Sequence, residues 1–181
     1  MRKWIGYYQN IVSHNICDEI INYSKNQKPL QPSTYSTSSG KSDRSKERVK
    51  MDDGWFRKGE KFYDDIRKSF QEVIRRYQEK HPDFVCQRHT DFRLNKYSYG
   101  GFMSRHVDNI HHSHGQEYGY PQVSALLFLN DNYKGGQLKI SNTTYNTKKG
   151  SAIIFPSNFM FPHEVNLITE GTRYSIVTWL M

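Results

Sequence analysis

Hydrophobic residues in the first half of the chain recur at helical spacing. The strongest pattern lies in residues 59–80, where apolar side chains return every three or four positions: Phe62, Ile66, Phe70, Val73, Ile74 and Tyr77. A shorter apolar stripe follows Ser13 and Asn15, which can cap a helix, and it ends before Pro29. Residues 3–12 suit a short strand. The pattern therefore predicts two helices preceded by a strand.

From residue 84 onward the pattern changes to short strands separated by Gly and Asn turns. In residues 91–99 the side chains alternate, with Arg93, Asn95 and Tyr97 on one face and Phe92 and Leu94 on the other. Further strands are predicted at 123–129, 138–140, 142–146, 151–155, 163–167 and 174–180. The fold class is α+β and mainly β: a small sandwich or barrel with N-terminal helices packed on one sheet.

Residues 30–53 break both patterns, because they are rich in Ser, Thr, Lys and Arg and poor in apolar residues. Such a stretch cannot bury much surface. Two interpretations stay open, a mobile surface loop and a lid that closes over a substrate.

Composition narrows the class of protein. Two cysteines, Cys17 and Cys86, exclude a disulfide framework or a zinc finger. No apolar run approaches the roughly 20 residues of a membrane helix, and residues 1–8 lack the apolar core of a signal peptide, so we expect no membrane partner and a cytoplasmic location. The Lys-, Asn-, Tyr- and Ile-rich composition is typical of AT-rich microbial or phage genomes.

The net charge of +8 indicates a basic surface. Such a surface attracts nucleic acid, acidic peptides or small anions, or is simply solvated. Charge alone does not choose among these.

A candidate metal site comes from three residues. His106 and Asp108 are two apart on an extended segment, so their side chains point the same way. We expect the third ligand, His163, to come from a separate strand across the barrel. Two histidines and one carboxylate are the facial triad of non-haem iron(II) oxygenases, which leaves positions open, whereas a structural zinc site would be closed.

Arg173 begins the last apolar strand and shares a face with Ser175, Val177 and Trp179. An arginine directed into an apolar interior needs an anion, and guanidinium geometry suits a carboxylate. A dicarboxylate held by a metal at one end would offer its distal carboxylate to Arg173, with Ser175 as a second donor.

Five motifs in this order resemble the prolyl 4-hydroxylase branch of the iron(II)/2-oxoglutarate dioxygenases, over about residues 84–181. They are Tyr97…Gly100…His106-Val107-Asp108, Leu129-Asn130-Asp131 with Gly135-Gly136, Lys149-Gly150-Ser151-Ala152 with Phe155-Pro156, His163-Glu164-Val165, and Gly171-Thr172-Arg173-Tyr174 with Trp179. The segments around His106, His163 and Arg173 are especially similar to oxygen-sensing prolyl hydroxylases.

The resemblance implies a double-stranded β-helix (jelly roll) in a single dioxygenase domain over residues 1–181. Residues 1–83 would give helical support and the loop, and residues 84–181 the catalytic core. It implies Fe(II), 2-oxoglutarate and O2, with release of succinate and CO2, and ascorbate is a candidate reductant.

The resemblance also assigns roles. Tyr97 would hydrogen-bond the co-substrate, and Trp179 would line the substrate pocket. Further candidate substrate contacts are Arg105 and, because they share a face with Tyr97, Arg93 and Asn95; a strand end exposed to solvent would also explain Arg93 and Asn95. Many members carry a tyrosine where this chain has Phe128, so Arg173 would rely on Ser175, Tyr97, Thr178 or water.

The resemblance favours peptidyl proline within a protein or peptide as the substrate. Two other functions stay open: the same chemistry on a free amino acid or nucleobase, and a non-catalytic jelly-roll module that binds a metal or anion. His111, His112 and His114 form a further cluster that suits either a metal or a loop at the substrate entrance.

Overall fold

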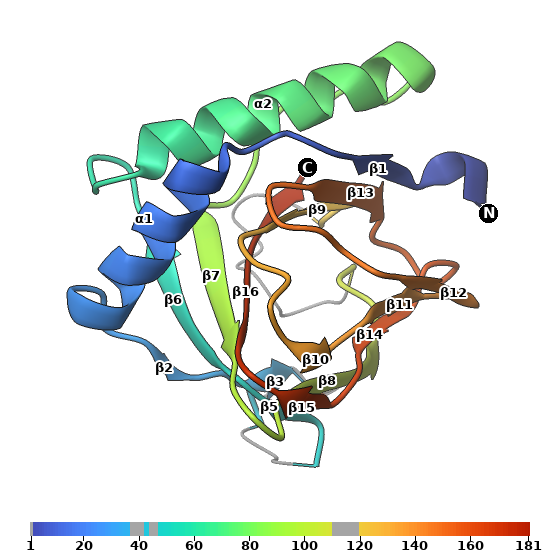
Figure 1. The fold of residues 1–181 in the computed structure, drawn as a ribbon. Helices are drawn as coiled ribbons and strands as arrows, with labels where there is room; N and C mark the ends of the chain where they lie inside the picture. The colour runs from blue at the N-terminus through green and yellow to red at the C-terminus, as the bar shows by residue number, and fades with distance from the viewer. Residues whose placement is uncertain (1, 37–41, 44–46, 110–119) are drawn as a thin grey trace.

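The protein is described by a computed structural model for residues 2–36, 42–43, 47–109 and 120–181. Two antiparallel sheets face each other, and two helices lie outside the larger sheet (Figure 1). The prediction of a mainly β fold with helices on one sheet is confirmed.

The larger sheet has seven strands in the order β1-β13-β9-β16-β7-β6-β2. These strands span Gly6–Tyr8 (β1), Ala152–Pro156 (β13), Val123–Phe128 (β9), Arg173–Leu180 (β16), Phe92–Tyr97 (β7), Asp52–Phe56 (β6) and Gln31–Pro32 (β2).

The smaller sheet has five strands in the order β12-β11-β14-β8-β5. They span Thr143–Tyr145 (β12), Leu138–Ile140 (β11), His163–Val165 (β14), Phe102–His106 (β8) and Val49–Lys50 (β5). Two further pairs join Lys134–Gly135 (β10) to Ile168–Glu170 (β15) and Tyr35–Ser36 (β3) to Ser42–Asp43 (β4).

The helices follow the apolar spacing. Helix α1 spans His14–Asn26, and the Ser13 hydroxyl accepts a hydrogen bond from the Ile16 amide at 3.3 Å, as a helix cap does. Helix α2 spans Tyr63–Lys80, four residues later than predicted. Phe62 adopts a φ of 68°, which is incompatible with the helix, and so delays its start. No described helix is both long and apolar enough to cross a membrane.

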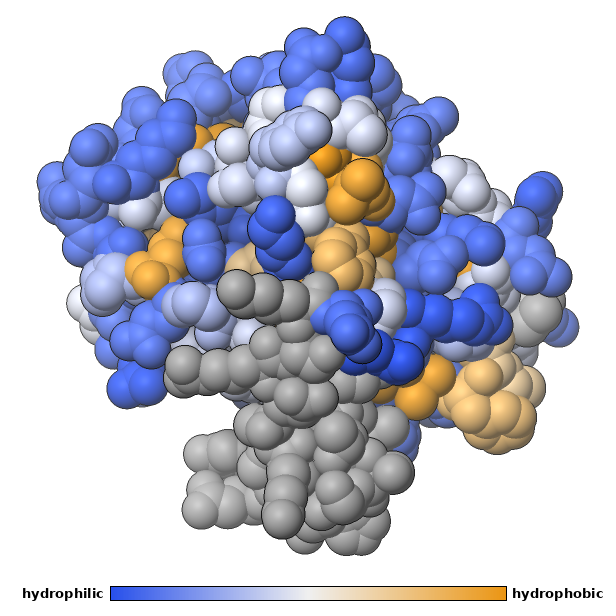
Figure 2. All heavy atoms as spheres, turned by 90° about the horizontal axis from the view of Figure 1, so that it is seen from below, coloured by the Kyte–Doolittle hydropathy of each residue, from blue (hydrophilic) through white to orange (hydrophobic). Residues whose placement is uncertain are grey.

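Two hydrophobic cores lie on opposite faces of the larger sheet. The first fills the space between this sheet and the helices, and includes Phe70, Val73, Phe92 and Leu94. The second lies between the two sheets. The face of the molecule seen from below is largely hydrophilic, with hydrophobic residues in separate patches (Figure 2).

The N-terminal part contributes more strand than the pattern predicted. Strand β6 pairs along β7, and β5 pairs with β8, so residues 49–56 extend both sheets. The prediction of a loop through residue 53 was therefore wrong at its C-terminal end. Residues 37–41 and 44–46 lie outside the described residues, and the lid stays a prediction.

Two other boundaries differ from the pattern. The strand predicted at 3–12 is a short 3-10 helix at Arg2–Trp4 followed by β1, because Asn10 turns the chain with a φ of 56°. The strand predicted at 163–167 ends at Val165, and β15 follows as an unpredicted strand.

Candidate active site

The proposed metal ligands come from two neighbouring strands of the smaller sheet. His106 is the last residue of β8, and Asp108 follows two residues later. His163 is the first residue of β14 and lies directly opposite His106 in the antiparallel pair. The prediction that His163 comes from across the barrel was therefore wrong: His106 and His163 lie on adjacent strands, and Asp108 follows just after β8.

A β-bulge aims His106 into the space between the sheets. His163 pairs with His106 and Val165 with Met103, so three steps along β8 oppose two along β14. The extra residue shifts the alternation of side chains. Met103 belongs to the core between the sheets, and the bulge lets His106 share its face.

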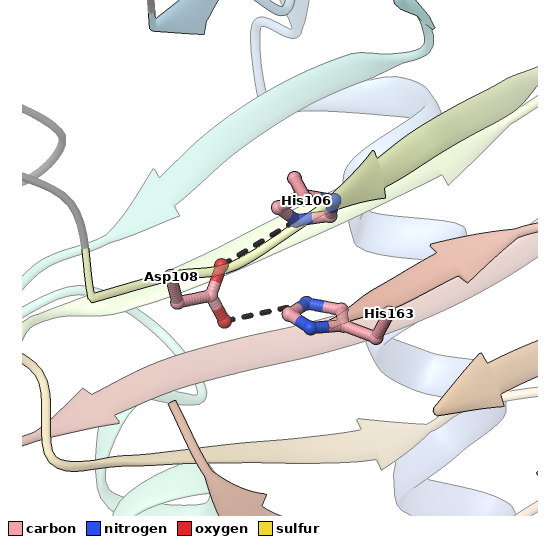
Figure 3. Close-up of side chains that lie close together, drawn as sticks. All are labelled: His106, Asp108 and His163. Atoms are coloured by element: carbon pink, nitrogen blue, oxygen red, sulfur yellow. Dashed lines mark ion pairs between the residues drawn. The ribbon is translucent and has the colours of Figure 1, made fainter. Parts of the chain in front are cut away.

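The three side chains converge on one point (Figure 3). The Nε2 atom of His106 lies 3.4 Å from Oδ1 of Asp108, and the Nε2 atom of His163 lies 3.4 Å from Oδ2. One ligand atom from each residue can be chosen so that all lie within 4.8 Å of one another. Asp108 and His163 are buried, and His106 is half-buried.

Backbone carbonyls orient both imidazole rings. The Nδ1 atom of His106 lies 2.8 Å from the Ser104 carbonyl, and Nδ1 of His163 lies 3.3 Å from the Phe161 carbonyl. A carbonyl can only accept, so each Nδ1 donates to it and each Nε2 faces Asp108, where it can also bind a metal ion. This second hydrogen bond is the usual device that fixes a metal-binding histidine.

The charge states suit a metal. Burial lowers the pKa of His163 to about 4 against the opposing effect of Asp108, so the ring is neutral at pH 7. Burial raises the pKa of Asp108, but His163, His106 and the Ser124 hydrogen bond outweigh it and hold the pKa well below its usual range. Neutral imidazole and ionised carboxylate are the forms that bind a divalent cation.

Asp108 is held by a residue that the sequence reasoning missed. The Ser124 hydroxyl donates to Oδ2 of Asp108 at 2.5 Å, and it lies 2.8 Å from the Ser157 hydroxyl. Both serines are fully buried. The available signal was a polar residue near the start of the otherwise apolar strand 123–129.

Arg173 is fully buried in the same space, on the facing sheet. Its Nη1 group donates to the Ser175 hydroxyl at 3.0 Å, but Nε and Nη2 are buried without a hydrogen-bond partner. The guanidinium carbon lies 5.1 Å from the Tyr97 ring and 5.4 Å from the Phe128 ring. Buried N–H groups of a cation are costly without an acceptor, so the pocket is built for an anion.

Tyr97 and Thr178 differ in their relation to Arg173. Burial raises the pKa of the Tyr97 hydroxyl, which therefore stays protonated and able to donate. Thr178 cannot support Arg173, because its hydroxyl donates to the Thr90 carbonyl at 3.0 Å and its position on β16 faces the opposite side. Phe128 forms a wall beside the guanidinium.

Two motifs position the Arg173 segment. The Asn130 side chain accepts from the Tyr174 amide at 2.8 Å and donates to the Thr172 carbonyl at 2.7 Å, so it clamps the backbone on both sides of Arg173. Gly136 has a φ of 62°, and a Cβ there would lie 2.3 Å from Ile168 and 3.2 Å from Cδ of Arg173. The motifs thus keep room for the arginine.

The candidate substrate residues have different surroundings. Arg93 stacks on Trp179, with its guanidinium carbon 4.7 Å from the ring centroid, and Asn95 is buried with an unpartnered Oδ1. Arg105 lies in the bulge of β8 and is exposed. Their contact with a substrate stays a prediction. The cluster His111, His112 and His114 lies outside the described residues.

The donor set fits the groups that the resemblance implied. Two imidazoles and a carboxylate suit Fe(II) with open positions. The unpartnered Nε and Nη2 of Arg173 suit one carboxylate of 2-oxoglutarate. The fit to Fe(II) and to 2-oxoglutarate rests on these side chains and not on the fold alone.

Comparison with known proteins agrees with this geometry. Residues 92–181 match the model of the 2OG-Fe(II) oxygenase superfamily. A PKHD-type hydroxylase of Rippkaea orientalis is 39% identical over 93 residues, which cover 48% of this chain and 40% of that protein. A PKHD-type hydroxylase of Stenotrophomonas maltophilia is 30% identical over 127 residues, or 64% and 55% of the two chains. The chain thus spans about half the length of these curated relatives.

Solved structures share the fold. A prolyl-4-hydroxylase of Pseudomonas putida superposes with a TM-score of 0.74 at 17% identity, covering 98% of this chain and 91% of that one. A Trichoplax adhaerens prolyl hydroxylase in complex with a hypoxia inducible factor peptide superposes with a TM-score of 0.77 at 18% identity. The match covers 99% of this chain and 84% of that one. The predicted jelly roll is confirmed. Through the domain that contains residues 92–181, the chain belongs to the 2OG-Fe(II) oxygenase superfamily.

Proposed function

We propose that the protein is an iron(II)- and 2-oxoglutarate-dependent dioxygenase that hydroxylates a C–H bond, with peptidyl proline as the substrate. The observation that carries this proposal is the convergence of His106, Asp108 and His163, whose ligand atoms lie within 4.8 Å of one another. Such an open triad serves non-haem iron oxygenases. Both sheets take strands from residues 1–83, which supports one dioxygenase domain over residues 1–181.

His106, Asp108 and His163 hold the iron in this proposal. Bound together, Fe(II), 2-oxoglutarate and O2 supply the oxidation: the co-substrate becomes succinate and CO2, and one oxygen atom enters the substrate. The Ser104 and Phe161 carbonyls keep the two rings aimed at the site. Ser124 fixes the carboxylate of Asp108.

Arg173 binds the distal carboxylate of 2-oxoglutarate through its unpartnered N–H groups, and Ser175 braces the guanidinium. Tyr97 adds a neutral hydroxyl donor. The apolar walls around Arg173 exclude water and so strengthen the ion pair. Ascorbate is proposed as the reductant that keeps iron in the ferrous state between turnovers.

A prolyl substrate is supported by fold neighbours that are prolyl hydroxylases, one of which is bound to a peptide. Arg93, Asn95 and Trp179 belong to the wall that faces such a substrate, and Arg105 to its rim. A free amino acid and a nucleobase are the alternative substrates for the same chemistry.

The test is a substrate panel incubated with Fe(II), 2-oxoglutarate, ascorbate and air, followed by mass spectrometry. We expect proline-containing peptides to gain one oxygen atom, with one succinate formed for each product. Oxygen gained only by free amino acids or by DNA would refute the prolyl assignment. Binding of metal and 2-oxoglutarate with no succinate from any member would instead indicate a non-catalytic module.

A further inference from the structure

Arg93 is a second cation on the inner face of the larger sheet, and no charged group of the described residues pairs with it. The side chain is half-buried, and its Nε group is buried without a hydrogen-bond partner. Within the described residues, no carboxylate lies within 4.0 Å of its guanidinium. Asp53 lies opposite Asn95 rather than opposite Arg93. A partly desolvated guanidinium in this state lacks the acceptor that would offset its burial.

The Arg93 guanidinium lies over the ring of Trp179, and Trp55 lies next to that ring. The guanidinium carbon lies 4.7 Å from the centroid of the Trp179 ring. Trp55 lies opposite Arg93 across the β6–β7 pair, and its ring centroid lies 6.2 Å from that of Trp179. Stacking on an indole restrains the planar fork and leaves its edge free for a ligand.

The 2-oxoglutarate proposed for Arg173 cannot also neutralise Arg93. In the β7–β16 pair, Tyr97 lies opposite Arg173 and Arg93 lies opposite Val177. Four residues along a strand separate the two positions by roughly 13 Å. A five-carbon diacid that is anchored on Arg173 by one carboxylate and held at the metal site by the other has no carboxylate left for the second arginine. Within the described residues no group supplies an anion to Arg93, which leaves its guanidinium available to a second ligand.

Arg93 is nevertheless connected to the proposed metal site. Trp179, on which it stacks, lies opposite Ser124 in the β16–β9 pair. Ser124 donates to Asp108. A ligand group on Arg93 therefore lies along the same wall as the reacting position. Trp55, the cross-strand neighbour of Arg93, also lines a cavity of about 460 Å³. Its lining includes the charged residues Lys28, Arg57, Asp53 and Glu60.

We propose that Arg93 is a subsite for a carboxylate of the prime substrate, and that the substrate is an acidic peptide with Asp or Glu near the residue to be hydroxylated. This inference rests on the proposed function, because it takes the metal site as the place of reaction. The net charge of +8 favours acidic partners at long range. Arg93 then selects among them at short range through a charge-assisted hydrogen bond.

The test compares peptide binding to the full chain and to two variants, by calorimetry without oxygen in the presence of Fe(II) and 2-oxoglutarate. The peptides contain one proline and a single Asp within three positions of it, and each has an Asn counterpart. Free proline tests whether the carboxylate that binds Arg93 can come from a small molecule instead of a peptide. Arg93→Met keeps the length of the side chain and removes its charge. Arg88→Met is the matched control, since Arg88 is exposed.

We expect at least one Asp peptide to bind the unchanged protein roughly tenfold more tightly than its Asn counterpart. Arg93→Met should lose this preference, and Arg88→Met should keep it. Arg93→Lys should retain part of it, which would separate loss of charge from misfolding.

The subsite is wrong if no carboxylate ligand binds the unchanged protein more tightly than it binds Arg93→Met. If free proline is the only ligand whose binding is tightened by Arg93, the carboxylate subsite stands, but a peptide is not the molecule that supplies the carboxylate. Succinate formation by the unchanged protein tests the proposed function separately. A preference for Asp peptides without succinate would refute the oxidation and leave the subsite standing.

Discussion

Strands β7 and β16 pair side by side, and their two faces differ in chemistry. The outer face carries Phe92, Leu94 and Ile176, which pack in the core beneath the helices. The inner face carries Asn95 and Arg173, where Oδ1 of the amide and Nε and Nη2 of the guanidinium are buried without partners.

Along the same two strands, the outer face therefore serves stability and the inner face serves ligand binding. Apolar burial on the outer face stabilises the fold by roughly 25 cal/mol for each Å² removed from water. Unpartnered polar groups on the inner face oppose folding until a ligand completes them. Substitutions on the outer face should therefore change the free energy of unfolding, and substitutions on the inner face should change ligand binding.

The largest effect is expected at the metal site. Asp108→Ala removes the only carboxylate of the triad, and we expect bound iron and succinate formation to fall below detection, because two neutral imidazoles hold the cation weakly. Metal content and succinate release are the measurements. Asp83→Ala, at an exposed position, is the control. Normal iron content in Asp108→Ala would show that the ligand assignment is wrong.

On the outer face, Phe70→Ala should lower the free energy of unfolding by about 3–5 kcal/mol, because it leaves a cavity. The Phe70 ring stacks on Phe92 at a centroid distance of 5.3 Å. Urea denaturation measures the change. Phe159→Ala is the control, since this side chain is 81% exposed and its loss should change stability by less than about 0.5 kcal/mol. Equal losses in the two variants would contradict the role of this core.

On the inner face, Arg173→Met should weaken 2-oxoglutarate binding by about 1.5–3 kcal/mol, which is tenfold or more. The free energy of unfolding of the ligand-free protein should fall by less than this loss in binding free energy, because the change removes buried unpartnered N–H groups. Calorimetry and urea denaturation give the two quantities, with Arg88→Met as control. An unchanged dissociation constant would remove Arg173 from the co-substrate site.

The smallest effect is expected at Ser124, which touches Asp108 and not the metal. Ser124→Ala should weaken metal affinity roughly tenfold, as is common for residues that orient a ligand. Metal titration measures this change. Ser69→Ala, on the surface of α2, should leave affinity unchanged. If the two variants bind metal alike, the Ser124 hydrogen bond does not tune the site.

The hydrophobic periodicity predicted those elements whose burial pattern is repeated along a single strand or helix. It found both helices and the alternation in β7, because burial on one face leaves a repeat in the sequence. It missed β6, since the run Asp52-Asp53-Gly54 has little strand propensity and is ordered by pairing with β7.

The proposed site was predictable in its residue types and not in its geometry. The motifs identified His106, Asp108, His163 and Arg173. The pairing of β8 with β14 and the bulge that turns His106 inward depend on long-range register, which spacing does not encode. Ser124 was missed for the same reason, because its contact with Asp108 joins different strands.

The most direct test of the central claim is succinate release by the unchanged protein, with Fe(II) and 2-oxoglutarate supplied together or singly. We predict succinate only when both are present with O2, and none from His163→Ala. Succinate formed at the same rate without iron, or by His163→Ala, would contradict the assignment of this triad as the metal site.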